Sequence, residues 1–240
     1  KGVSPKAYAK RKDVNVNCEM KDFQKAGYEL TVNKSNISTY SQAFYSAPRI
    51  ASNLVYYNLG VGRKYRASGQ LNKILAPKTI QKYSSKFHKC LKHIMKSEKQ
   101  TFIYSNFVAS GGVNDFILAM KLHGIPKSNY GVFQTNEDAK NKRLIDKFNK
   151  GKIQIIIGSP AMKEGISLKN CREVHLLDPY WNSSRVNQVI GRAIRFCSHV
   201  SLPANERSVK VYHYIATIKK VKSVDEYIKD IAKSKQFIIS

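Results

Sequence analysis

Two arginines and a glutamine stand at a spacing that suits the binding of an anion. In the stretch QVIGRAIR, Gln188, Arg192 and Arg195 recur at intervals of four and three residues, and an α-helix brings residues at these intervals onto one face. The apolar residues between them fall on the other sides, so they can be buried while the guanidinium groups point outward. Gly191 costs a helix interior about 1 kcal/mol relative to alanine, which indicates that another group approaches the backbone there. An ordinary basic surface helix would explain the arginines but not this glycine.

Three loops with small and polar residues could bring further groups to the same place. NFVASGG follows the apolar run TFIYS, GSPAMKEGISL follows IQIII, and DPYWNSS follows EVHLL and leads into the arginine stretch. Small residues allow backbone N–H groups to approach phosphates closely. Each loop alone would be ordinary turn chemistry, but three such loops in order with the two arginines predict a single site.

The elements that position these loops form a regular alternation from residue 83 onward. Short apolar runs typical of buried strands alternate with amphipathic stretches of helical period, which predicts a parallel sheet covered by helices on both faces. In such sheets, ligands bind outside the carboxyl ends of the strands, where the three loops begin. The expected strands are 101–107, 130–134, 152–159, 173–178 and 209–216, and the expected helices are 84–97, 112–124, 136–151, 183–195 (with a serine N-cap) and 223–235 (with a Ser-x-x-Glu capping box).

Residues 1–82 are rich in Lys, Asn, Ser and Tyr and show no regular period. We expect a basic linker or insertion that folds onto the domain. The stretch GVGRKY within it lacks the third glycine of a dinucleotide-binding loop and no strand–turn–helix unit surrounds it, which argues against a Rossmann-type transferase.

Composition favours a polyanionic partner. The 42 Lys and Arg residues against 16 Asp and Glu give a formal net charge of +26, and both halves of the chain are basic. Nucleic acid is the natural candidate, ahead of an anionic membrane, because no amphipathic anchor or membrane-length apolar window is evident. The four cysteines are scattered without zinc-finger spacing, so we expect free thiols and no metal site.

The stretches described above resemble the motifs of the C-terminal RecA-like lobe of superfamily-two helicases and translocases. QVIGRAIR is similar to the sixth helicase motif, GSPAMKEGISL to the fifth and FIYSNF to the fourth. The stretch from GSPAMKEGISL to RFCSH looks most like enzymes of large cytoplasmic DNA viruses, such as poxvirus nucleoside triphosphatase I, the small subunit of the early transcription factor, and asfarvirus and giant-virus counterparts. The resemblance covers about residues 83–240 and implies a three-layer RecA-like α/β fold. We expect the RecA-like domain at 83–222 and a C-terminal helix and tail at 223–240.

The resemblance also implies a role for each matching position. Arg192 and Arg195 would reach the phosphates of ATP with Mg across a cleft between two lobes, with Arg195 as the arginine finger and Gln188 positioning them. Planar guanidinium groups suit the charge that phosphoryl transfer spreads over oxygens. Gly165 and Gly191 would line the nucleotide side of the cleft. The backbone of a nucleic acid would be contacted by a further set, namely Ser105, Asn106, Ser159 and Ser167.

Two motifs of the same family, the phosphate loop Gly-x-x-x-x-Gly-Lys-Ser/Thr and the Asp-Glu-x-Asp/His box, do not occur in the sequence. The family carries them on its first lobe, so we expect this chain to be half of an ATPase, inactive alone. The expected partners are nucleic acid, the N-terminal helicase lobe and viral transcription machinery, with no membrane, in the cytoplasmic viral factory or the virion. The alternative is a non-catalytic nucleic-acid or protein docking module with vestigial helicase motifs.

Overall fold

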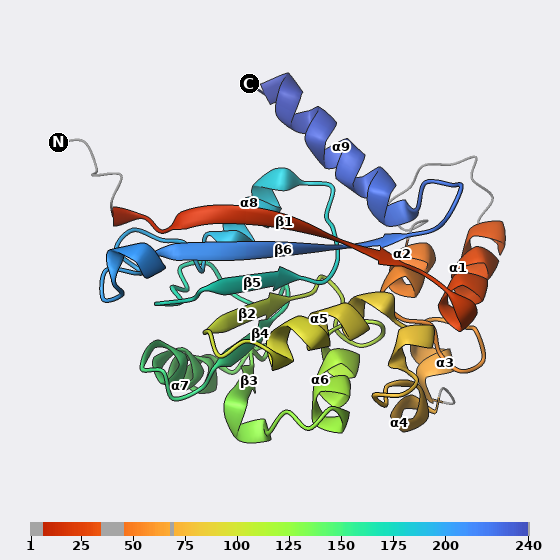
Figure 1. Cartoon of the computed structure of the whole chain (residues 1–240), viewed down its shortest axis with the longest axis horizontal. Helices are drawn as coiled ribbons and strands as arrows, with labels where there is room; N and C mark the ends of the chain where they lie inside the picture. Colours follow the sequence, from red (N-terminus) through yellow and green to blue (C-terminus); the bar gives the residue numbers. More distant parts are fainter. Residues whose placement is uncertain (1–6, 35–45, 68–69, 240) are drawn as a thin grey trace.

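The computed structural model describes residues 7–34, 46–67 and 70–239, and a single six-stranded sheet runs through them (Figure 1). The strand order is β1-β6-β5-β2-β4-β3, and every neighbouring pair is parallel. The strands are β1 Lys10–Glu19, β2 Thr101–Tyr104, β3 Tyr130–Val132, β4 Ile155–Gly158, β5 Glu173–Leu176 and β6 Ser208–Thr217. The α/β class and the parallel sheet expected from the sequence are confirmed.

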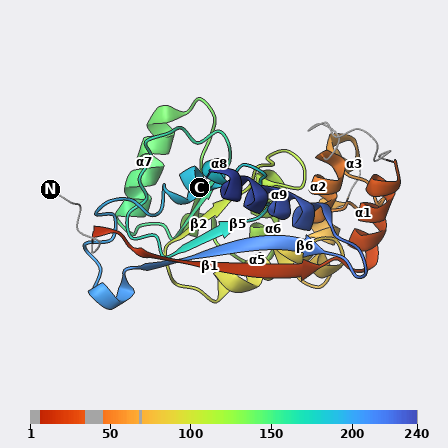
Figure 2. The ribbon, with the colours of Figure 1, turned by 90° about the horizontal axis from the view of Figure 1, so that it is seen from above.

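Helices cover both faces of the sheet, which makes the three layers that were expected. In Figure 2, α7, α8 and α9 lie on one side of the sheet and α5 on the other. The helices are α1 Asp22–Lys34, α2 Ser46–Asn53, α3 Arg63–Ala67, α4 Leu71–Ile74, α5 Ser85–Met95, α6 Val113–Leu122, α7 Asp138–Asn149, α8 Ser183–Ile190 and α9 Val224–Ile239, with short 3₁₀ turns at Ile80–Lys82, Lys127–Asn129 and Ala204–Glu206. Within the described ranges, no helix combines the length and hydropathy needed to cross a membrane.

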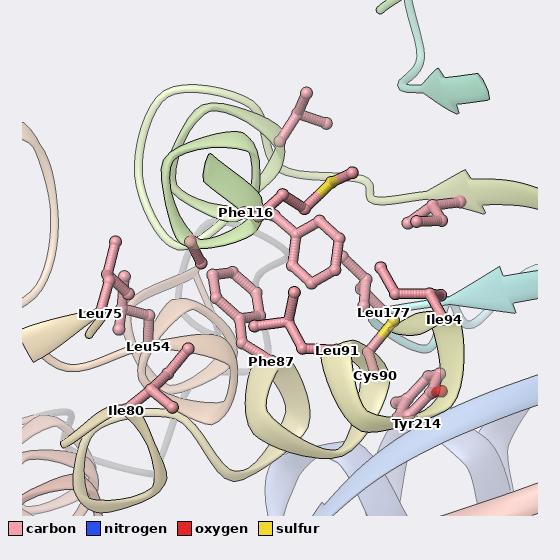
Figure 3. Close-up of a cluster of buried hydrophobic side chains, with 14 of the residues drawn as sticks. Leu54, Leu75, Ile80, Phe87, Cys90, Leu91, Ile94, Phe116, Leu177 and Tyr214 are labelled. Atoms are coloured by element: carbon pink, nitrogen blue, oxygen red, sulfur yellow. The ribbon is translucent and has the colours of Figure 1, made fainter. Parts of the chain in front are cut away.

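The central strands are apolar on both faces because each face is covered. Phe102 and Ile103 are neighbours in β2 and both are fully buried, but they belong to two different clusters on opposite faces of the sheet. Figure 3 shows the cluster under α5 and α6, where the rings of Phe87 and Phe116 meet edge to face with centroids 5.1 Å apart. Burial on both faces explains why the central strands read as continuous apolar runs.

The expectation of an irregular extension is wrong for residues 10–19. These residues form β1, which pairs with β6 from Lys10↔Ser208 to Glu19↔Thr217. β1 is an edge strand and exposes most of its side chains. Of its ten residues, Cys18 is the one that is buried. The stretch therefore lacks the apolar pattern that marks the central strands. The domain boundary at residue 82 stays a prediction.

The C-terminal helix begins as the sequence predicts. The Glu226 backbone N–H donates to Ser223 Oγ at 3.2 Å, and the Ser223 N–H donates to Glu226 Oε2 at 2.8 Å. These two bonds make the reciprocal capping box, which satisfies two backbone donors at the helix start.

A buried ion pair joins this helix to α5. Lys86 and Asp225 are 0% and 1% exposed, and Lys86 Nζ contacts Asp225 Oδ2. Lys86 also donates to Asn53 Oδ1 at 2.9 Å, and Asp225 Oδ2 accepts the Ala216 N–H at 2.8 Å. Because a charge removed from water is costly unless it is paired, each partner requires the other.

Replacing Lys86 by methionine should therefore destabilise the chain by about 3–5 kcal/mol, since the lysine stem is kept but Asp225 loses its partner. Urea unfolding followed by circular dichroism measures this difference. The control is Lys92→Met on the exposed face of the same helix, which should change stability by less than about 0.5 kcal/mol. Equal midpoints for the two variants would contradict a structural role for the pair.

Candidate functional site

Helix α8 is shorter than the sequence predicts. Its N-cap is Asn182, whose Oδ1 accepts the Arg185 N–H at 3.2 Å, where a serine cap was expected. It ends at Ile190 with Gly191 as its C-cap. The next two N–H groups bond to carbonyls three residues back, Arg192 to Val189 and Ala193 to Ile190, so the backbone tightens into turns after α8. The prediction of one helix through residue 195 is wrong because the low helix propensity of glycine allows the helix to stop there.

Gln188, Arg192 and Arg195 consequently do not share one helix face. Gln188 is exposed on α8. Arg192 Nη2 donates to Met162 O at 3.0 Å, and Arg195 Nη1 donates to Gly165 O at 3.0 Å. The two arginines converge on the loop of residues 159–168 that follows β4. The structure thus brings both arginines and Gly165 together through carbonyls of this loop, while Gln188 stays outside the group.

The two glycines of the predicted site, Gly165 and Gly191, differ in backbone conformation. Gly165 is exposed and has φ +84°, a left-handed conformation that favours glycine, and open space surrounds it. Gly191 has an ordinary helical φ of −60°. A Cβ at Gly191 would meet only carbonyl oxygens of the preceding turn, Asn187 O at 3.1 Å and Gln188 O at 3.4 Å. Within the described part of the chain, only this preceding turn approaches the Cβ position of Gly191, and its predicted contact with a ligand stays a prediction.

Arg192 carries a donor without an acceptor. Its Nη1 is buried and has no hydrogen-bond partner among the described residues. Burial lowers the pKa of Arg192, while the nearby Tyr104 and Glu164 act in the opposite direction. A buried donor left unpaired costs about 1–3 kcal/mol. An anionic oxygen at this position would remove that cost, so the site is chemically suited to a phosphate.

The loops after β2, β4 and β5 meet at one edge of the sheet, as predicted. Tyr104 at the end of β2 is in register with Gly158 and with Leu176, the last residues of β4 and β5. Ser105 N donates to Gly158 O at 3.3 Å, which links the first loop to the second. The carboxyl ends of these parallel strands therefore form the predicted edge.

Asp178 organises this edge, although the sequence analysis did not single it out. It accepts hydrogen bonds from Ser105 Oγ at 2.6 Å, from the Asn106 N–H at 2.9 Å and from Asn106 Nδ2 at 2.6 Å. Asn53 Nδ2 of α2 donates from 3.2 Å. The signal that could have identified it is an acidic residue placed directly after the apolar run EVHLL, where a strand was expected to end.

The predicted nucleic-acid contacts occupy different environments. Ser105 is fully buried and its hydroxyl is committed to Asp178, whereas Asn106 is half-buried. Ser159 is buried and its Oγ accepts the Ala161 N–H at 3.3 Å. Ser167 is half-buried, and its carbonyl accepts from Asn149 Nδ2 of α7 at 3.1 Å. Contact of these four residues with a nucleic acid stays a prediction.

A buried arginine from α2 lies among the aromatic side chains of the same loops. The guanidinium carbon of Arg49 lies 4.9 Å from the ring centroid of Phe107 and 5.0 Å from that of Trp181. Arg49 Nη2 donates to Pro179 O at 3.3 Å, and Tyr180 stacks on Trp181 with centroids 4.2 Å apart. Arg49 therefore packs the loop after β2 against the loop after β5. More than 50 residues separate it from either loop in the sequence, so no local signal could have identified it.

Comparison with protein families and curated proteins gives consistent matches. Residues 85–197 match the model of the helicase conserved C-terminal domain. The candidate ATP-dependent RNA helicase R563 of Acanthamoeba polyphaga mimivirus is 34% identical over 94% of this chain and 44% of its own length. Nucleoside triphosphatase I of Melanoplus sanguinipes entomopoxvirus is 34% identical over 65% of this chain and 25% of its own length. The chain thus spans less than half the length of these relatives.

Solved structures share the fold. The C-terminal part of the Fun30 ATPase domain has a TM-score of 0.65 at 18% identity and covers 94% of this chain and 90% of that one. The Sulfolobus solfataricus SWI2/SNF2 ATPase core in complex with dsDNA has a TM-score of 0.60 at 15% identity, over 95% of this chain and 45% of that one.

Replacing Asp178 by asparagine should destabilise the chain by about 3 kcal/mol, because an amide would place N–H groups against the donors of Ser105 and Asn106. The control is Asp146→Asn, an exposed carboxylate of α7. Urea midpoints of the two variants measure the difference. If Asp178→Asn unfolds at the same urea concentration as its control, Asp178 does not hold the loops.

Proposed function

We propose that the chain is the C-terminal lobe of an ATP-dependent nucleic-acid helicase or translocase, because residues 85–197 match the model of the helicase conserved C-terminal domain. The RecA-like fold and the names of the viral relatives support this proposal. An N-terminal lobe, supplied by a longer protein, would hold most of ATP and Mg. The chain would serve viral transcription or replication in the cytoplasmic viral factory.

The observation that carries the proposal is the convergence of Arg192 and Arg195 on the loop of residues 159–168. The Nη1 of Arg192 has no hydrogen-bond partner among the described residues, so it can donate to a phosphate oxygen. Arg195 is exposed and can reach outward. In this proposal the two guanidinium groups stabilise charge on the transferring phosphoryl group. The nucleotide site around them would be lined by Gly165, Gly191 and Gln188.

Nucleic acid would lie along the same edge of the sheet. The support comes from the net charge of +26, from the loops that carry Asn106, Ser159 and Ser167, and from the archaeal ATPase core whose solved complex contains dsDNA. Contacts of small polar groups with the phosphate backbone position a nucleic acid without reading its sequence.

One observation favours the alternative, a docking module without catalysis. Both arginines already donate to carbonyls of their own chain, so they could serve only to hold the loop. Loss of a catalytic arginine lowers ATP turnover far more than loss of a structural one, so a single substitution distinguishes the two roles.

In the longer protein that contains both lobes, Arg195→Ala should reduce ATP turnover by about 10³–10⁵, roughly 4–7 kcal/mol of transition-state stabilisation. Steady-state ATPase rates measure this loss. The matched control is Arg207→Ala, because Arg207 also donates to two backbone carbonyls, those of Leu202 and Val200, but at the amino end of β6. A loss of less than about tenfold for Arg195→Ala, or an equal loss for both variants, would favour the docking module.

The chain by itself should bind nucleic acid with little sequence preference and with strong dependence on salt. Each phosphate that a lysine or arginine neutralises should contribute about −0.9 to the slope of log K against log salt on a duplex. Fluorescence anisotropy with two duplexes of different sequence, at several salt concentrations, measures both properties. Binding that does not change with salt, or no binding at low salt, would argue against a nucleic-acid partner.

A further inference from the structure

A groove that adjoins the site described above lies between α8 and α9, over β1, β5 and β6. It encloses about 340 Å³, and both helices lie on the same side of these strands (Figure 2). Its charged and amide lining comes from β1, the loop after β5, α8, β6 and α9. The principal polar residues are Arg11, Asp13, Asn187, His213, Lys229 and Lys233.

The strand side of the groove is neutral in sum. Arg11 donates from Nε and Nη2 to the two carboxylate oxygens of Asp13, each at 2.9 Å, and from Nη1 to Asn187 Oδ1 at 2.9 Å. His213 Nε2 lies 2.7 Å from Asp13 Oδ1. Burial lowers the pKa of His213, the nearby Asp13 acts in the opposite direction, and the Nε2–H donates to the carboxylate. Arg11 offsets the charge of Asp13.

The helix side of the groove carries two positive charges, and the two carboxylates of the lining, Asp13 and Asp178, already accept hydrogen bonds from other residues. Lys229 and Lys233 lie one turn apart on α9, and neither forms an ion pair in the part of the chain that the structure describes. Burial lowers the pKa of Lys229 and the charge of Lys233 lowers it further, while the charges of Asp230 and Glu226 act in the opposite direction. Like charges at this spacing destabilise a helix. An anion bound between α9 and Arg11 would relieve the repulsion.

The groove is continuous with the edge where nucleic acid is proposed to lie. Asp178, Pro179 and Tyr180 of the loop after β5 form one end of the groove. Arg185 stacks over the Tyr180 ring at 4.4 Å and donates to its hydroxyl at 2.7 Å, which places a further cation beside the groove. Because the groove adjoins this edge, a nucleic acid that lies along the edge can continue into the groove, and this continuity favours nucleic acid over an acidic peptide.

We propose that this groove binds phosphodiester groups of a nucleic acid and extends its path from the carboxyl edge of the sheet across α8 to α9. The inference rests on the proposed function, because it assigns a second segment of the same ligand. Lys229 and Lys233 supply the charge, and Asn187 with Arg11 supplies hydrogen bonds on the opposite wall.

The test is binding of a labelled duplex to the 240-residue chain, with Lys229→Glu/Lys233→Glu compared with Lys150→Glu/Lys152→Glu. The control pair is exposed at the amino end of β4 and makes the same change in net charge. Loss of two phosphate contacts should make the slope of log K against log salt shallower by about 1.8. The affinity difference between 50 and 200 mM salt should then shrink by roughly tenfold, and the control should show the wild-type slope. Lys229→Gln/Lys233→Gln, which removes the two positive charges without adding negative ones, should give a slope that is shallower to a similar extent.

Each outcome distinguishes this inference from the proposed function. If the wild-type chain binds no duplex at low salt, the proposed function fails. If wild-type binding is strong and both glutamate pairs have the same slope, the groove does not contact nucleic acid and this inference alone is overturned. If the Lys229 and Lys233 variants keep the wild-type slope but lose binding of a labelled hexaglutamate peptide, the groove is a peptide site and the inference is again overturned.

Discussion

The carboxylate of Asp178 is the group on which the carboxyl edge of the sheet depends. It is 6% exposed and belongs to the loop after β5, yet its hydrogen-bond donors come from α2 and from the loop after β2. A charge removed from water costs several kcal/mol unless such donors surround it. The charge is therefore compensated only when segments distant in sequence meet at this edge, and the positions of the loops follow from that condition.

A second buried carboxylate is connected to the first through one side chain. Asn53 donates from Nδ2 to Asp178 and accepts at Oδ1 from Lys86, the partner of Asp225. Arg49, one turn earlier in the same helix, is buried nearby; burial lowers its pKa, and the charges of Asp178 and Asp225 oppose that change. Two cations and two anions thus compensate each other in the interior. Helix α2 is an integral part of the lobe because it supplies Arg49 and Asn53.

The segment that follows α8 is bonded to the loop after β4. Leu168 N donates to Arg192 O at 2.8 Å, and both guanidinium groups donate to carbonyls of the 159–168 loop. Under the proposed function, the same donors would shift toward phosphate oxygens, so the loop would respond to the nucleotide.

The sequence by itself determined the order of strands and helices from residue 83 onward, the capping box at Ser223 and the convergence of three loops, because hydrophobic period and strand ends are local properties. It could not predict the edge strand β1, whose exposed side chains leave no apolar pattern, nor the stop of α8 before Arg192. Only the tertiary structure decided that Asp178, Asn53 and Arg49 meet, because the partners of a buried charge are the residues close to it in space, whatever their separation along the chain. The family resemblance identified Arg192 and Arg195, but the acceptors that hold them were decided by packing alone.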